Sequence, residues 1–128
     1  MNILLDTSGY SELHRGNEAV LDVIRHATTV SVPSIVLGEL HSGFKAGTRL
    51  QENRERLAKF LAKQTVRVLN VTEATALRYA EVNYYLRVKG KPIPTNDVWI
   101  AALALEHGLH LLALDAHFRE IPMLLLKP

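Results

Sequence analysis

Two short apolar runs in this sequence each end on a carboxylate. The run NILL is followed by Asp6, and the run LHLLAL is followed by Asp115. An ionised carboxylate that is buried without a partner is strongly unfavourable, so two such endings ask for a common explanation. Two more acids accompany apolar segments, Glu39 in PSIVLGEL and Asp97 in TNDVWIAA. We predict that these four acids form one site.

Carboxylates gathered in this way need cations beside them. Two carboxylates about 5 Å apart repel each other by roughly 3 kcal/mol at an effective dielectric constant of about 20. The chain has no cysteine, and a set of oxygen donors favours Mg²⁺ or Mn²⁺ over zinc. One or two such ions could activate a water for attack on a phosphodiester and offset the charge on the phosphorus oxygens. The predicted metal ligands and catalytic residues are therefore Asp6, Glu39, Asp97 and Asp115.

Helix and strand patterns alternate along the whole chain, which predicts an α/β fold. Strands are expected at residues 2–5, 28–32, 66–69, 109–113 and, as an edge strand, 123–126. Helices are expected at residues 8–15, after Asn17, from Ser34, at residues 48–63, from Thr72 to about Gly90, and from a cap at Thr95 or Asn96 to Gly108.

Strands joined by helices form a parallel sheet, and the ligand site of such a sheet lies outside the carboxyl ends of its strands. Asp6 and Asp115 follow strands at that edge. Asp97 begins a helix after a loop that returns there, and Glu39 lies in the helix that leaves the second strand. We expect an α/β/α sandwich with a central parallel sheet of four to five strands, formed as a single domain by residues 1–128.

Each acid also has a simpler structural explanation. Asp6 and Asp115 could cap short helices, and Asp97 could complement a helix dipole. Glu39 could be a solvated helix residue. The placement of all four at one edge of the sheet favours a site.

The composition of the chain indicates where the protein is located and which partners it can bind. The absence of cysteine excludes disulfides and thiol catalysis and predicts a reducing, cytoplasmic location. No secretory signal and no run long enough to span a bilayer is visible. The net charge of +2 is compatible with a nucleic-acid partner but does not require one.

The sequence resembles the PIN-domain ribonucleases, and most closely the VapC-type toxins of toxin–antitoxin pairs. The resemblance rests on LLDTS, PSIVLGEL, TNDVWIAA and LLALDAHFREIP, in this order across essentially the whole chain. It implies that the four acids are the family's quartet, which binds Mg²⁺ or Mn²⁺ and cleaves single-stranded RNA. It also implies a homodimer, a VapB-like antitoxin that blocks the site, and polar roles near the metal for Thr7 and Asn96.

The chain departs from the pattern of this family at two positions. Many relatives have a threonine in place of Ala113 and a second aspartate in place of His117. An Asp115–His117 transition-metal pair is therefore an alternative, although side chains two residues apart diverge in a strand or a helix.

Other residues have less specific roles. The candidates for phosphate contacts are Lys45, Arg49, Arg87, Lys89 and Lys91. The resemblance suggests an antitoxin groove, with core packing as the alternative, at Tyr10, Leu13, Leu40 and Phe44. Trp99 is expected to pack in the interior, and one of Tyr84 and Tyr85 should face inward.

Two other functions compete with the nuclease. One is a binding module of the same fold that has lost catalysis. The other is a phosphoacceptor receiver domain, which the terminal LLLKP suggests, although DTS and NVTEAT lack the acids that such domains carry after their first and third strands.

Overall fold

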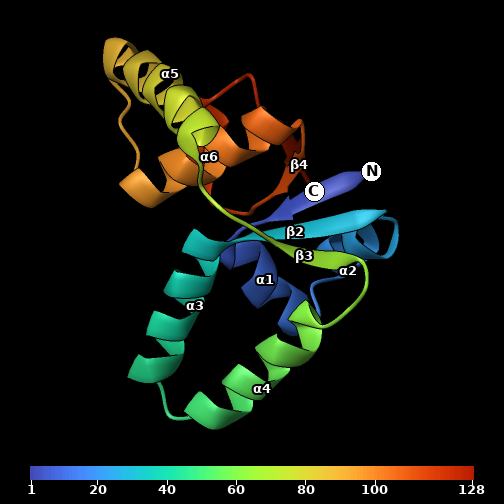
Figure 1. Ribbon diagram of the computed structural model, residues 1–128. Helices are drawn as coiled ribbons and strands as arrows, with labels where there is room; N and C mark the ends of the chain where they lie inside the picture. Colours follow the sequence, from blue (N-terminus) through green and yellow to red (C-terminus); the bar gives the residue numbers. More distant parts are fainter.

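The computed structural model describes all of residues 1–128 and has a five-stranded sheet with helices on both faces (Figure 1). The strands are β1 (Asn2–Leu5), β2 (Thr29–Pro33), β3 (Val66–Leu69), β4 (His110–Leu112) and β5 (Leu125–Lys127). The helices are α1 (Thr7–His14), α2 (Glu18–Arg25), α3 (Ser34–Ala46), α4 (Leu50–Leu61), α5 (Glu73–Lys89), α6 (Thr95–His107) and the 3-10 helix η1 (Ala116–Glu120). The predicted α/β/α sandwich with a parallel sheet is confirmed.

The strand order is β3-β2-β1-β4-β5, and every neighbouring pair is parallel. The chain moves outward from β1 to β3 with α1–α4 on one face, and then crosses to β4 with α5 and α6 on the other face (Figure 1). The direction of winding therefore reverses between β1 and β4, where open α/β sheets bind their ligands. Receiver domains have the order 2-1-3-4-5, so this sheet does not favour the receiver alternative.

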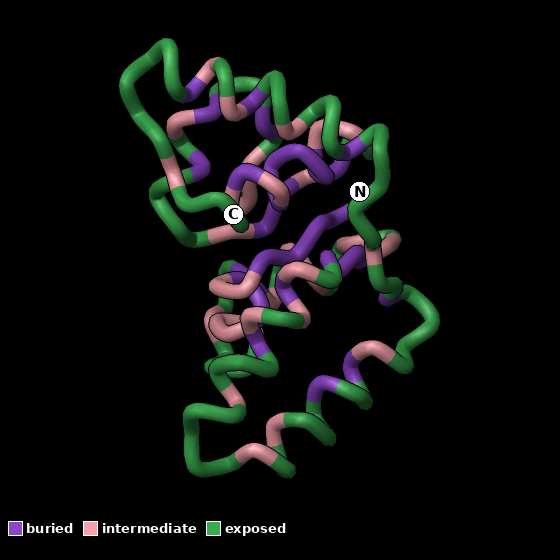
Figure 2. The backbone as a smooth tube through the Cα atoms, turned by 60° about the vertical axis from the view of Figure 1, so that its left-hand side comes forward, coloured by how far each residue is buried: buried purple, intermediate pink, exposed green.

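The core lies around the central strands and α6, and much of the buried (purple) backbone in Figure 2 lies in the middle of the molecule. Ile3, Leu4 and Leu5 have no exposed surface, because helices cover both faces of β1. Trp99 of α6 packs on Tyr79 of α5, with 4.1 Å between ring centroids, as expected for a packing residue. Tyr85 packs against the core, whereas Tyr84 is exposed.

Helices α3 and α4 form a hairpin that extends away from the sheet and is largely exposed (Figures 1 and 2). Its inner side is apolar, and Leu57 and Phe60 of α4 are buried there. None of the helices combines the length and the apolar character that crossing a membrane requires.

Several predicted boundaries are confirmed, and others are wrong. Asn17 caps α2 by accepting from the Val20 N–H, and Gly90 and Gly108 end α5 and α6 with positive φ. Neither Thr95 nor Asn96 caps α6, because Pro94 holds the extended backbone before the helix. The edge strand begins at Leu125 instead of residue 123, because the Leu124 N–H bonds the Ile121 carbonyl in a turn.

Candidate metal centre

Asp6 is the first residue after β1 and the N-cap of α1. One carboxylate oxygen accepts from the Gly9 N–H at 2.7 Å, and the Ser8 hydroxyl lies 2.9 and 3.0 Å from the two oxygens. The side chain is 4% exposed. The capping role considered for Asp6 is therefore real, and it fixes the carboxylate in a buried position.

The chain around Asp6 is bound tightly to the end of β4. The Asp6 N–H bonds the Leu112 carbonyl at 3.3 Å, and the Leu114 N–H bonds the Ser8 hydroxyl at 3.1 Å. Gly9 permits this approach, since a Cβ at that position would lie 2.5 Å from the Leu112 carbonyl oxygen. The two strand ends that carry Asp6 and Asp115 are thus joined by backbone and hydroxyl hydrogen bonds.

Glu39 projects from α3 toward the start of α1. The Thr7 hydroxyl donates to Glu39 Oε1 at 2.7 Å. Glu39 is half-buried and is thus oriented by a residue adjacent to Asp6. This differs from the freely solvated position that was its simpler explanation.

Asp97, Asp115 and His117 meet at the start of α6. His117 Nδ1 lies 2.9 Å from Asp97 Oδ2 and 3.0 Å from Asp115 Oδ1. Asp115 also caps η1, because its Oδ1 accepts from the His117 N–H at 3.0 Å. The expectation that residues 115 and 117 diverge is wrong, since a cap followed by a 3-10 turn folds the ring back over the carboxylate.

A cavity of about 440 Å³ brings these groups together. Its lining consists of Glu39, Pro94, Thr95, Asn96, Asp97, Asp115 and His117. Three of the four predicted acids therefore share one cavity. Asp6 does not line this cavity, but it lies close enough for the charges of Asp97 and Asp115 to raise its pKa.

Burial and the neighbouring carboxylates disfavour the ionised forms of Asp6 and Asp97. Burial raises the pKa of Asp6 to about 6, against the lowering effect of the hydrogen bonds from Gly9 and Ser8. Burial also raises the pKa of Asp97, and the charges of Asp115 and Glu39 add to the increase, whereas the His117 hydrogen bond opposes it. A cation bound at this position would relieve these repulsions.

The donor set fits a divalent cation. One ligand atom each from Asp97, Asp115 and His117 lies within 4.8 Å of the others. Carboxylate oxygens suit Mg²⁺ and Mn²⁺, and an imidazole nitrogen suits Mn²⁺ and later transition metals. The arrangement can hold a cation beside a phosphodiester in an open cavity.

The sequence pattern gives little indication of the roles of three residues, Ser8, Gly9 and His117. Ser8 and Gly9 follow Asp6 in the motif LLDTSG, and their role depends on β4, more than a hundred residues away. Local geometry predicts that the His117 ring diverges from Asp115, which argues against a shared site. Only its position after a capping aspartate, in DAH, could have indicated a fold-back.

None of the five predicted phosphate-binding cations lines the acidic cavity. Lys89 bonds the Glu120 carbonyl at 2.7 Å and its carboxylate at 3.5 Å, and Arg49 lies 4.0 Å from Glu52. Lys45, Arg87 and Lys91 are exposed. Phosphate contacts from these residues stay a prediction.

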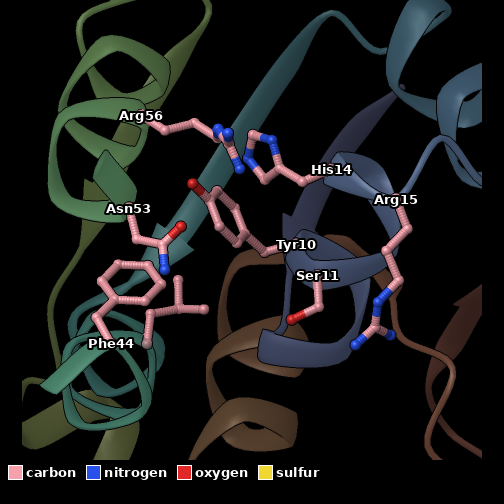
Figure 3. Close-up of a pocket in the computed structure, with 8 residues that line it drawn as sticks. Tyr10, Ser11, His14, Arg15, Phe44, Asn53 and Arg56 are labelled. Carbon is pink, nitrogen blue, oxygen red and sulfur yellow. The ribbon is translucent and has the colours of Figure 1, made fainter. Parts of the chain in front are cut away.

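A second cavity, of about 310 Å³, lies between α1, α3 and α4 (Figure 3). Tyr10, Leu40 and Phe44 of the predicted groove line it, together with Ser11, His14, Arg15, Asn53 and Arg56. Leu13 instead packs against the core. The Tyr10 hydroxyl is buried without a protein partner and points toward the side chains of α4 in Figure 3.

Comparisons of this chain with family models and with known proteins agree on one family. The family model of the PIN domain matches residues 3–124. Ribonuclease VapC5 of Mycobacterium tuberculosis is 30% identical over 120 residues, which are 92% of this chain and 86% of that protein.

Solved structures match over nearly the whole chain. VapBC-5 from Mycobacterium tuberculosis, a member of the VapBC family of toxin–antitoxin systems, has a chain with a TM-score of 0.73 and 25% identity, covering 98% of this chain and 95% of that chain. VapBC-1 from nontypeable Haemophilus influenzae gives a TM-score of 0.86 at 23% identity, covering 99% and 97%, and supports the fold alone.

Proposed function

The chain belongs to the PIN-domain family, and on this premise we propose that it is a metal-dependent endoribonuclease, the toxin of a toxin–antitoxin pair. The proposal treats residues 1–128 as one catalytic domain that acts in the cytoplasm. Its similarity to a protein named ribonuclease VapC5, and to a chain of a VapBC toxin–antitoxin complex, supports this function.

One observation carries the proposal. Acids from three separate parts of the chain, Glu39, Asp97 and Asp115, line one cavity at the reversal point of the sheet, and buried Asp6 lies beside them. Such a gathering is electrostatically unfavourable by itself. A cation bound among the acids would offset this repulsion, which would explain why the acids lie together.

In the proposed mechanism, Asp6, Asp97 and Asp115 would hold the cation, and Glu39 would complete the set or orient the attacking water. The ion, when bound, would supply positive charge beside the phosphodiester and lower the pKa of the attacking water. Thr7 keeps Glu39 in place and Ser8 keeps Asp6 in place through their hydroxyl hydrogen bonds. The Asn96 side chain, in the cavity lining, can donate to a phosphate oxygen.

The site is open enough for a polymer. A second hollow of about 560 Å³ shares Glu39 and Asn96 with the acidic cavity and continues along α3 past Gly38 and Ser42. An RNA strand whose bases are unpaired can lie across both hollows and present one phosphate to the acids. We propose Mg²⁺ or Mn²⁺ as the ion, because the donor set is dominated by oxygen.

We place the antitoxin at the cavity between α1, α3 and α4. Leu40 and Phe44 offer apolar walls, whereas Arg15 and Arg56 offer positive charge, and no acid lines the cavity. An antitoxin segment with an acidic or carbonyl oxygen can accept from Arg15 or Arg56. Leu40 follows Glu39 in α3, but the two cavities share no lining residue.

The homodimer is proposed to use α5. Leu77, Tyr84 and Val88 lie on one face of this helix and are 67%, 70% and 70% exposed. Sedimentation velocity should show a dimer for the wild type and a monomer for Leu77→Glu combined with Val88→Glu. Ala76→Glu, on another face of α5, should remain dimeric. A monomeric wild type at tens of micromolar would remove this part of the proposal.

The nuclease is tested with purified protein, single-stranded RNA and Mg²⁺ or Mn²⁺. Wild type should cleave the RNA, chelation should stop cleavage, and Asp97→Asn should abolish it. Asp22→Asn, an exposed acid of α2 remote from the cavity, should cleave normally. Cleavage by Asp97→Asn would contradict the mechanism.

The inactive binding module is separated from the nuclease by two readouts. A module without catalysis should bind no Mn²⁺ in calorimetry, or bind it without cleaving RNA. The nuclease requires both uptake and cleavage, and both should be lost together in Asp97→Asn.

A further inference from the structure

His117 has a place that the acidic quartet alone does not explain. Asp115 caps η1, and the chain turns so that the His117 ring approaches the carboxylate two residues before it. The ring nitrogen Nδ1 lies 2.9 Å from Asp97 Oδ2 and 3.0 Å from Asp115 Oδ1. The ring therefore points into the cavity that the acids line.

These separations match the edges of a coordination shell. Neighbouring ligands of an octahedral ion with bonds of about 2.1 Å are about 3.0 Å apart. A hydrogen bond from an N–H to a carboxylate has the same length, but one N–H shared between two carboxylates serves both of them poorly. A cation between the three groups would satisfy every lone pair that faces it.

We propose that His117 donates a ring nitrogen to the divalent cation and thereby gives this chain a preference for Mn²⁺ over Mg²⁺. The inference rests on the proposed function, because it concerns the same cavity. Mg²⁺ takes oxygen ligands almost exclusively, whereas an imidazole nitrogen strengthens the binding of Mn²⁺ and later first-row ions. His117 is thus a residue that selects the metal.

The test reads the metal's ligands directly and needs no RNA. Pulsed electron paramagnetic resonance of the Mn²⁺-loaded protein should show coupling to ¹⁴N, and labelling with ¹⁵N-histidine should change that coupling. His117→Gln should remove it and lower the Mn²⁺ affinity in calorimetry by about tenfold, with a smaller change for Mg²⁺. His26→Gln is the matched control, since His26 is an exposed histidine 3.5 Å from a single carboxylate, Asp22.

The possible outcomes separate the two proposals. Mn²⁺ that binds in an Asp97-dependent way without nitrogen coupling would overturn the role of His117 and leave the nuclease proposal intact. A wild type that binds no Mn²⁺, or binds it equally after Asp97→Asn, would overturn both. The ¹⁵N-histidine measurement uses the wild-type chain, so its result stands even if His117→Gln folds poorly.

Discussion

Thr7 donates a hydrogen bond of 2.7 Å to Glu39 and thereby connects this acid to Asp6, the residue before Thr7. Thr7 follows Asp6 directly, whereas Glu39 lies 32 residues further on, in α3. The bond holds the α3 carboxylate at the end of β1. Groups that orient metal ligands in this way are often as important for binding as the ligands themselves.

Replacing Thr7 should therefore weaken metal binding without unfolding the protein. Thr7→Val keeps the shape of the side chain but removes the donor, and Mn²⁺ affinity in calorimetry should fall by about tenfold. Thr7→Ser keeps a hydroxyl and should bind nearly as well as the wild type. Equal affinities for all three proteins would mean that Glu39 acts independently of this bond.

Asp6→Asn should stabilise the metal-free protein at neutral pH. Burial raises the pKa of Asp6 to about 6, so the folded protein keeps a proton that the unfolded chain has lost. Stability therefore falls as pH rises from about 4 to about 6, and the deficit is complete above that range. Urea unfolding in a chelator should show Asp6→Asn about 3 kcal/mol more stable than wild type at about pH 7.5.

The stability difference at Asp6 should close below about pH 3, where both states of the wild type are protonated. A variant that is more stable but does not cleave RNA would show that the carboxylate is kept for function. A variant less stable at neutral pH would mean that its hydrogen bonds outweigh the burial of its charge.

Gly9→Ala should destabilise the fold. The added Cβ would lie 2.5 Å from the Leu112 carbonyl oxygen and 2.9 Å from Leu5 Cδ1, and both neighbours belong to central strands. We expect a loss of about 1–3 kcal/mol in the free energy of unfolding, measured in urea. Gly43→Ala, in α3 with no atom within 4 Å of its added Cβ, should instead gain about 0.5–1 kcal/mol.

Tyr10→Phe should separate stability from antitoxin binding. The hydroxyl is buried without a protein partner, and leaving such a group unsatisfied costs about 1–3 kcal/mol. Its removal should leave the urea midpoint unchanged or higher, and antitoxin affinity should stay the same because the hydroxyl has no exposed surface. A lower urea midpoint would mean that the hydroxyl has a hydrogen-bond partner within the protein.

Some elements of the fold were predictable because their signals are local. The bounds of β1 and β3, the Asn17 cap and the glycine stops of α5 and α6 agree with the sequence pattern. Apolar periodicity, caps and positive-φ glycines act within a few residues of the chain. The parallel sheet and its functional edge follow from the alternation of these elements.

The arrangement of the candidate site depended on contacts between distant segments. Ser8 bonds the Leu114 N–H across 106 residues, and His117 bonds Asp97 across 20. No local pattern contains either contact, because each depends on how β4 and η1 pack against β1 and α6. The sequence pattern predicts the direction of the His117 ring wrongly for the same reason.

The sequence by itself determined which acids the chain offers and which edge of a parallel sheet they reach, because strand and helix formation are governed by neighbours along the chain. Only the tertiary structure decided that Glu39, Asp97 and Asp115 share a cavity while Asp6 is buried beside it. It also added an imidazole to that cavity. Positions of side chains to within an ångström depend on packing between layers, which no single segment encodes.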